Sequence, residues 1–178
     1  MIGLRPALAV DAAAIARVHV AAWHLALDAV VPAAMKEAVD VATYQAMWES
    51  LLSQHAGAHT TIVATDDGAV IGFATAGIKT AATPGIDCEL HTLYVSPDYQ
   101  RRNVGRRLLH LIETVMAGAG CRSMAATVID TPQARGFFLS SGAELAASNK
   151  LAVAEGPAPA MDIFIWRQLQ PHLLETLI

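Results

Sequence analysis

The 178-residue sequence has few cysteines and no long hydrophobic run. Cys88 and Cys121 are too few for a disulfide framework, and both lie in strand-like runs, so we expect buried free thiols. No apolar run reaches about 18 residues, and the N-terminal stretch lacks a basic region followed by an apolar one. We therefore expect no transmembrane helix, no signal peptide, no membrane partner and a cytoplasmic location.

Basic residues are also scarce, since 12 Lys and Arg stand against 16 Asp and Glu, which gives a net charge of -4. Such a balance argues against nucleic-acid binding, which needs a broad basic surface. Four of the 12 basic residues nevertheless fall within seven positions, at Arg101, Arg102, Arg106 and Arg107. A cluster this local suits one compact anion.

The pattern of apolar residues predicts an α/β fold with a mixed sheet, in a single domain of residues 1–178 with a core of about 2–168 and a tail of 169–178. The Asp-Gly pair within 66–68 predicts a hairpin turn, and Asp11 is a candidate helix cap. The predicted strands span 2–7, 60–65, 69–78, 86–95, 121–129, 144–156 and 161–169. The predicted helices follow Asp11 and span about 32–55, 103–118 and 131–142, and Thr131 is a candidate N-cap for the last of them, before Pro132 as its first helical residue. Strands 86–95 and 121–129 should form a parallel crossover unit.

The arginine cluster lies between a strand and a helix start, where unpaired N–H groups and the helix dipole attract anions. Guanidinium groups suit phosphate oxygens, Gly105 lets a ligand approach its backbone, and Asn103 tolerates the positive φ of a tight turn. A solvated, positively charged helix start is the alternative. Positive side chains are unfavourable near the positive end of the helix dipole, however, and a bound anion would offset this repulsion. The turn has neither the Walker nor the three-glycine dinucleotide pattern.

Three stretches carry a family resemblance. "LYVSPDYQRRNVGRRLL" (93–109) resembles the acyl-CoA signature of the GNAT superfamily of N-acetyltransferases, and "TPQARGFFLSSGAE" (131–144) is similar to its second motif. The opening residues 4–23 resemble the first strand and helix of the family. The resemblance implies a mixed, mostly antiparallel sheet of about seven strands flanked by about four helices. Its splayed parallel pair, 86–95 and 121–129, would form the cleft for CoA.

The resemblance also implies acetyl-CoA as cosubstrate and no metal. Pantetheine would bond the backbone near Leu93 and Val95, the diphosphate would meet the amides of 101–106, and an N–H near Leu93 or Tyr94 would face the acetyl oxygen. An amine would then attack directly, without an acyl-enzyme. The residues assigned to the cofactor are Leu93, Tyr94, Val95, Gln100, Arg101, Arg102, Asn103, Val104, Gly105, Arg106, Thr131, Ala134, Phe137 and Phe138.

Glu89 is the first candidate for the base that accepts the proton of the amine, and His91 is the second. Strand alternation predicts that these two residues share one face with Leu93 and Val95. A structural ion pair for Glu89 and a core histidine for His91 are the alternatives.

Trp23 and His24, with His19, lie on the first predicted helix, which borders the acceptor site in this family. We assign Trp23, His24 and Glu89 to the substrate side, with packing as the alternative. A closed pocket lined by Trp23 and Trp48 would favour a small molecule, and an open groove would favour a peptide.

Two positions depart from the family pattern. Phe138 stands where relatives carry a Tyr that can protonate the leaving thiolate, and Tyr94, Tyr99 and Ser141 are weak stand-ins. We count Tyr94 among the candidate catalytic residues with Glu89 and His91. Thr131 stands where relatives carry Asn.

The sequence therefore predicts an acetyl-CoA-dependent N-acetyltransferase acting on a small-molecule amine. A non-catalytic acyl-CoA-binding module and a protein or peptide N-acetyltransferase stay open as alternatives. The apolar final strand "IFIW" (163–166) is a candidate exposed edge, which invites dimerisation, so a homodimer is one option.

Overall fold

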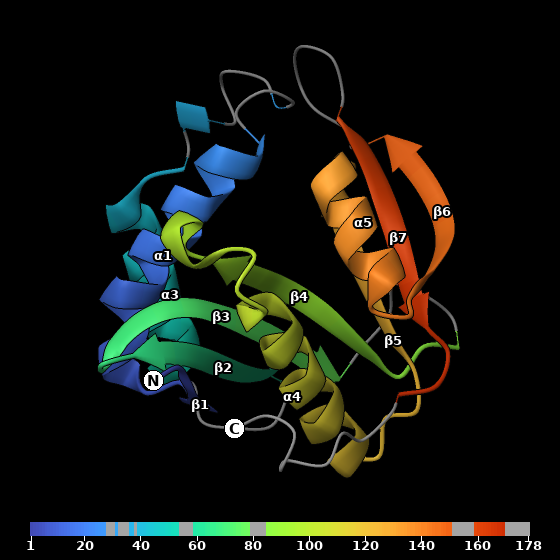
Figure 1. The fold of residues 1–178 in the computed structure, drawn as a ribbon, viewed down its shortest axis with the longest axis horizontal. Helices are drawn as coiled ribbons and strands as arrows, with labels where there is room; N and C mark the ends of the chain where they lie inside the picture. The colour runs from blue at the N-terminus through green and yellow to red at the C-terminus, as the bar shows by residue number, and fades with distance from the viewer. Residues whose placement is uncertain are drawn as a thin grey trace.

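The computed structural model describes residues 1–27, 31, 36–37, 39–53, 59–78, 85–150 and 159–169. Within these ranges the chain forms seven strands and four helices, with short 3-10 turns at Ala9–Asp11 and Pro97–Tyr99 (Figure 1). The strands are β1 (Gly3–Pro6), β2 (His59–Asp66), β3 (Ala69–Ile78), β4 (Cys88–Val95), β5 (Met124–Ile129), β6 (Glu144–Lys150) and β7 (Ala160–Trp166). The helices are α1 (Ala12–Leu27), α3 (Val41–Ser53), α4 (Val104–Gly118) and α5 (Pro132–Ser140).

The strands form one mixed sheet in the order β1-β2-β3-β4-β5-β7-β6. β4 and β5 pair in parallel, and the other neighbours pair antiparallel. The predicted α/β class and the parallel pair are therefore confirmed. The predicted exposed edge at the final strand is wrong, because β7 pairs with β5 on one side and β6 on the other. β6 is the edge on that side, and most of its residues are exposed.

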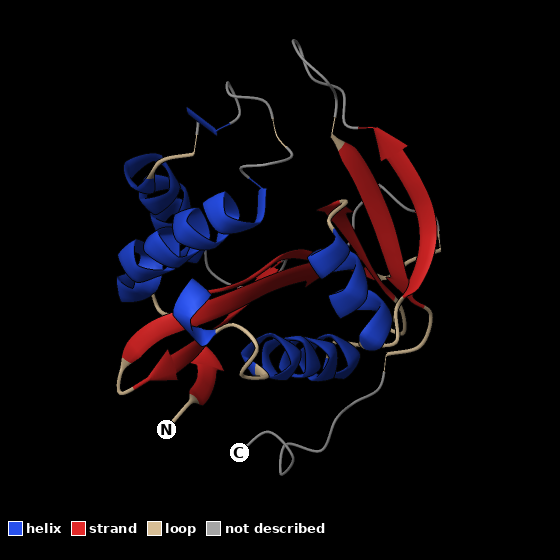
Figure 2. Cartoon of the chain, turned by 45° about the horizontal axis from the view of Figure 1, so that its top comes forward, coloured by secondary structure: helices blue, strands red, loops and turns tan. Residues whose placement is uncertain are grey.

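Helices cover both faces of the sheet, with α1 and α3 on one side and α4 on the other (Figure 2). Because apolar residues recur at helical spacing, each of these helices turns one apolar side toward the sheet. Ile15 and Val18 of α1 join a buried cluster with Trp48 and Phe73. By length and composition the segment Ala9–Leu27 could cross a membrane, but core helices pass the same test, and half of the window is buried in the fold.

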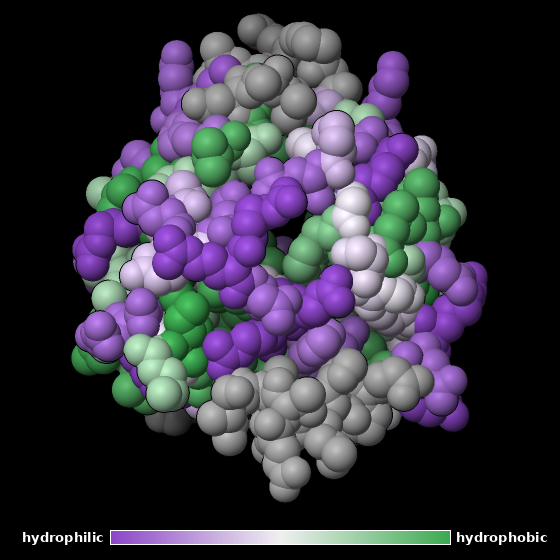
Figure 3. All heavy atoms as spheres, in the orientation of Figure 1, coloured by the Kyte–Doolittle hydropathy of each residue, from purple (hydrophilic) through white to green (hydrophobic). Residues whose placement is uncertain are grey.

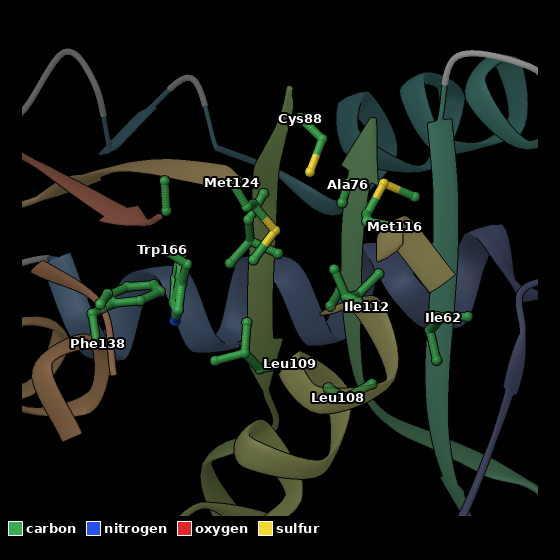
Figure 4. Packing of buried hydrophobic residues seen from close by; sticks show 14 of the residues in the cluster. Ile62, Ala76, Cys88, Leu108, Leu109, Ile112, Met116, Met124, Phe138 and Trp166 are labelled. Atoms are coloured by element: carbon green, nitrogen blue, oxygen red, sulfur yellow. The ribbon is translucent and has the colours of Figure 1, made fainter. Parts of the chain in front are cut away.

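The opposite face of the sheet is packed by the apolar stripe of α4. Leu108, Leu109, Ile112 and Met116 lie in a second cluster with residues of β2 to β5 and with Phe138 of α5 (Figure 4). Full burial of each such side chain stabilises the fold by about 1.5–3 kcal/mol. The first two arginines of the cluster lie just before α4, and the other two lie in its first turn, so this packing fixes where the cluster lies relative to β4.

Local expectations had mixed outcomes. Asp67 and Gly68 have φ of 47° and 84°, so the β2–β3 hairpin turn is confirmed. Both cysteines are buried and free, as expected. Asp11 does not cap α1 as predicted, because its carboxylate accepts the N–H of Leu8 and pairs with Arg5 at 2.7 Å.

Several predicted segments fall only partly within the described residues. α3 confirms the second helix over 41–53, but the prediction of one helix from 32 is wrong, because residues 39 and 40 are not helical and α3 begins at Val41, where Asp40 accepts the N–H of Thr43 at 3.0 Å. The predicted end at 55 lies outside the described residues. The same holds for residues 151–156 of the predicted strand 144–156 and for 170–178 of the tail.

Candidate active site

β4 and β5 run together for only three residue pairs, Cys88–Met124, Glu89–Ala125 and Leu90–Ala126. Beyond these pairs the two strands continue to Val95 and Ile129 without further mutual pairing among the described residues. A cleft of about 1090 Å³ opens between them. Figure 3 shows the surface hollowed near the middle of this face, with hydrophilic side chains on one side of the opening and more apolar ones on the other. Backbone groups on the facing strand edges are thus left for another chain or a ligand with amide groups.

The structure brings most of the predicted site residues to this cleft. The predicted residues that line it are Trp23, His91, Leu93, Tyr94, Val95, Gln100, Arg101, Asn103, Val104, Gly105, Arg106, Thr131, Ala134, Phe137 and Phe138. Three predicted residues, Glu89, Arg102 and His24, are outside the lining. The roles predicted for all of these residues remain predictions.

The turn before α4 has two residues in the left-handed region. Asn103 has the positive φ expected of it, 64°, and Arg101 has a φ of 63° that sequence reasoning missed. The first backbone bond of the helix runs from the Arg107 N–H to the Asn103 carbonyl at 3.1 Å, so the amides of residues 104–106 precede it. The first turn has no acidic residue, and the Asn103 side chain makes no capping bond. The positive end of α4 therefore faces the cleft without a compensating charge of its own.

The four arginines of the cluster have different surroundings. Arg101 and Arg106 line the cleft. Arg102 lies over the Tyr99 ring, 5.1 Å from its centre, and Arg107 donates to the Ile2 carbonyl at 3.1 Å. Only two of the four side chains are thus at the cleft wall. We call this part of the cleft, with Arg101, Asn103, Gly105 and Arg106, the arginine end.

Gly105 lies where the cleft is narrow. A Cβ on this residue would be 3.4 Å from the Phe137 ring and 3.5 Å from Leu93. Alanine would just fit, and any longer side chain would fill the space between α4, β4 and α5. The expectation that glycine keeps this backbone approachable is consistent with the geometry.

The side chain of Gln100 connects the turn to β4 by a hydrogen bond. Its side-chain amide donates to the Val95 carbonyl at 3.1 Å, and it also accepts from Gln133 of α5 at 3.3 Å. The turn is thereby linked to both walls of the cleft.

A β-bulge in β4 changes which residues share a face. Thr92 pairs with Thr75 and Leu90 pairs with Ala76, which leaves His91 as the extra residue. Leu93 therefore points to the α4 side with Leu90, whereas Glu89 points to the α1 side with Tyr94. The prediction that Glu89, His91, Leu93 and Val95 share one face is wrong, because the bulge shifts the alternation by one residue.

The two candidate bases are placed differently. His91 is exposed and lines the cleft, and its ring packs edge-to-face on His59 with the centres 5.1 Å apart. Glu89 is half-buried and does not reach the lining. His59 and Glu89 both pair with Gly77 of β3 and so flank it on the same face. The bulge thus places His91 nearer the cleft than Glu89.

The candidate proton donors for a leaving thiolate also differ in availability. The hydroxyl of Tyr99 donates to Asp66 at 3.3 Å, and that of Ser141 donates to the Phe138 carbonyl at 2.7 Å. Tyr94 lines the cleft, and burial raises its pKa to about 12, so its phenol keeps its proton at neutral pH. Tyr94 and Tyr99 line the cleft, and Ser141 does not.

The α5 wall of the cleft is held by hydrophobic packing and a cap. Phe138 is stacked on Phe164 with the ring centres 5.1 Å apart and lies edge-on to Trp166 (Figure 4). Thr131 is the N-cap of α5, as predicted, and its hydroxyl accepts the Ala134 N–H at 3.1 Å. The acceptor capacity of this hydroxyl is thus partly used within the protein.

The opposite end of the cleft is apolar and is bounded by α1. We call it the α1 end: Ala22, Trp23, Ala26 and Leu27 of α1, Ile129 of β5 and Met161 of β7. Of this set, sequence reasoning assigned only Trp23 to the site. The i, i+3, i+4 spacing of 22, 23, 26 and 27 could have identified the helical members. Ile129 and Met161 face one another across the β5–β7 ladder, a pairing that needed the structure.

Two other aromatic candidates on this side, His19 and Trp48, are buried in the interior. His19 is buried, and its Nδ1 accepts the Trp48 indole N–H at 3.3 Å. Burial lowers the pKa of His19 to about 4, so the ring is neutral. Trp48 is buried in the core and does not line the cleft, contrary to the closed pocket considered above. His24 has its Nε2 3.3 Å from the Val39 carbonyl.

Among the described residues, no group of three His, Cys, Asp or Glu side chains is placed to hold a metal ion.

Comparisons with known proteins agree on one family. The sequence profile of the acetyltransferase (GNAT) family matches residues 21–143. An uncharacterized N-acetyltransferase of Bacillus subtilis, YuaI, is 27% identical over 155 residues, which are 86% of this chain and 87% of that protein.

Two solved structures share the fold. PaiA N-acetyltransferase from Thermoplasma acidophilum, solved in complex with coenzyme A, superimposes with a TM-score of 0.72 at 19% identity over 91% of this chain and 98% of that one. YncA from Salmonella typhimurium, solved with its cofactor acetyl-CoA, gives a TM-score of 0.70 at 23% identity over 97% and 96%. The family profile covers well over half of the sequence, and this chain belongs to the GNAT family of acetyltransferases.

Proposed function

We propose that the protein transfers the acetyl group of acetyl-CoA to a primary amine of a small molecule, by direct attack while both substrates are bound. The observation that carries this proposal is the cleft between the splayed strands β4 and β5, which joins the arginine end to the apolar α1 end. Family membership supports acetyl transfer, and relatives solved with coenzyme A or acetyl-CoA support the cosubstrate.

The residues at the arginine end fit a CoA diphosphate. Arg101 and Arg106 supply charge, and the amides of residues 104–106 supply donors without helical acceptors. The unpaired edge of β4 near Leu93 and Val95 would hold the amides of pantetheine. Acetyl-CoA supplies a thioester whose C–S bond breaks as the new C–N bond forms. The protein brings the two reactants together, and such positioning can contribute most of the acceleration.

His91 is the base in this proposal. An amine must lose a proton to become a nucleophile, and histidine is the side chain best suited to accept one near neutral pH. Its exposed ring lines the cleft and contacts His59, which is also exposed. A proton taken up at His91 therefore has a short way to solvent. Glu89, outside the lining, has a supporting role.

Tyr94 stabilises the leaving thiolate by a hydrogen bond. Full proton transfer is unfavourable, because the pKa of Tyr94 is raised to about 12, whereas a thiol titrates near about 8.5. The phenol still offers a donor in a mostly buried place, where such a bond is strong. In this proposal Tyr94 takes the role that the family's tyrosine would have at the position of Phe138.

The direct experiment is thiol release from acetyl-CoA across a panel of amines, amino acids, polyamines, aminoglycosides and short peptides. We expect turnover with at least one small amine. His91→Gln should lower kcat/KM by on the order of 100-fold, and Glu89→Gln by less than about tenfold.

Two results would contradict the proposal. Tight binding of acetyl-CoA without turnover on any member of the panel would favour a non-catalytic acyl-CoA-binding module. If Glu89→Gln lowered kcat/KM as much as His91→Gln or more, Glu89 and not His91 would be the base.

A further inference from the structure

We propose that the acceptor is a monoamine carried on an apolar body, and that amines with a second ammonium group are poor acceptors. This inference rests on the acetyl transfer proposed above and concerns the α1 end of the same cleft. It follows from which charges line the cleft and which surfaces form its wall.

The described part of the cleft lining contains no aspartate or glutamate. Its full charges are those of Arg101 and Arg106, and they are positive. Among the described residues, Asp130 and Asp162 adjoin Ile129 and Met161 of the α1 end, and both are already paired. Asp130 is 3.1 Å from Arg135, and the fully buried Asp162 is bonded to Arg135 at 2.8 Å and to Ser148.

The wall of the α1 end is hydrophobic. Trp23 and Leu27 belong to a buried cluster against which Tyr94 and Ile129 pack from the two splayed strands. Ala26 is an exposed residue of the lining, and its small side chain leaves room beside Trp23. An acceptor that lies here contacts an indole ring and aliphatic side chains, and it buries apolar surface of its own.

An apolar wall favours a single amine for a chemical reason. Desolvation disfavours the charged form of an ammonium group and so lowers its pKa, which helps to deliver the neutral nucleophile. A second ammonium group would stay charged beside an apolar wall, and the described residues of the lining include no carboxylate to pair with it. Unpaired charges are costly to bring into such surroundings.

Hexylamine and 1,6-diaminohexane test the inference as a matched pair, because they share a six-carbon chain and differ by one amino group. We expect kcat/KM for hexylamine to exceed that for the diamine by on the order of tenfold. Ala26→Glu places a carboxylate on the wall and should lower this ratio to about one or below. Leu25→Glu is the control, since Leu25 is the preceding residue of α1, is 60% exposed and is outside the lining.

The outcomes separate the inference from the function on which it rests. A wild-type preference for the diamine, or a ratio that does not move in Ala26→Glu, overturns the inference and leaves acetyl transfer in place. A fall of the ratio in Leu25→Glu as large as in Ala26→Glu also overturns it. Absence of turnover on either amine and on the panel above, with acetyl-CoA bound in calorimetry, overturns the proposed transfer itself.

Discussion

The arginine end and the α1 end of one cleft are built in opposite ways. The arginine end combines two guanidinium groups with a helix start whose first turn has no acidic residue. The α1 end combines an indole with aliphatic side chains, and its described residues have no charge. The first end is suited to an anion and the second to a neutral, apolar body. A transferase that moves an acetyl group from a polyanionic cosubstrate to an apolar amine has a use for both ends.

The two ends also differ in how they are encoded. The arginine end comes from six consecutive positions, 101–106, so its chemistry can be read directly from the sequence. The α1 end comes from α1, β5 and β7, which the fold brings together from distant parts of the chain. The following predictions change one end at a time.

The largest effect is expected when the narrow part of the arginine end is filled. Gly105→Leu should weaken acetyl-CoA binding by on the order of 100-fold, about 2.7 kcal/mol, because the side chain would occupy the space beside Phe137 and Leu93. Gly118→Leu is the matched control, as nothing lies within 4 Å of a Cβ at the other end of the same helix. Equal affinities in calorimetry would place the diphosphate elsewhere.

The burial of His19 beneath the α1 end should make the free energy of unfolding depend on pH. The pKa of His19 is about 4 in the fold, below the ordinary 6.5, so the unfolded chain binds more protons between these values. The free energy of unfolding should therefore fall as the pH drops, by about 2 kcal/mol between pH 7 and pH 5. Chemical denaturation should show that His19→Gln removes this loss.

The control for His19 is the exposed His59, where the same change should leave the pH dependence in place. Persistence of the full loss in His19→Gln would contradict a neutral, buried His19. Retention of acetyl-CoA affinity in the variant would show that the arginine end is unaffected.

Substitutions of the different arginines should weaken acetyl-CoA binding to different extents. Arg106→Gln should weaken acetyl-CoA binding by on the order of tenfold, since a charge-assisted donor at the cleft wall is lost. Arg102→Gln should cost less than about threefold, because that side chain lies over Tyr99 outside the lining. Calorimetry on both variants measures the two affinities for acetyl-CoA. A larger loss of affinity in Arg102→Gln would show that the Arg102 side chain turns toward the ligand.

The smallest effect is expected at the α5 wall. Thr131→Val removes the hydroxyl that accepts the Ala134 N–H and should lower the free energy of unfolding by about 1 kcal/mol. The affinity for acetyl-CoA should change by less than about threefold. Thr127→Val, at an exposed position of β5, is the control for stability. A tenfold loss of affinity in Thr131→Val alone would give the hydroxyl a direct part in binding.

Sequence reasoning predicted those features that depend on neighbouring residues. The Asp67-Gly68 turn, the N-cap at Thr131 and the positive φ of Asn103 each follow from local chemistry, and all three are confirmed. The parallel strand pair around α4 is confirmed as well.

The positive φ of Arg101 and the partner of Asp11 are local features that it missed, whereas the other misses depend on pairing between distant segments. The bulge at His91 exists only in the ladder with β3, and it reversed the expected relation of Glu89 to Leu93. The interior place of β7 depends on β6 folding back to form the edge. Strand alternation cannot reveal either one, because an extra residue and a strand order have no local signature.

The most direct test of the account compares acetyl-CoA with S-acetylpantetheine, which lacks the diphosphate, in calorimetric titrations at low and high salt. If the arginine end binds the diphosphate, acetyl-CoA should bind on the order of 100-fold more tightly, and only its affinity should fall as salt is raised. Equal affinities, or the same salt response for both compounds, would contradict the assignment of the arginine end to the cosubstrate.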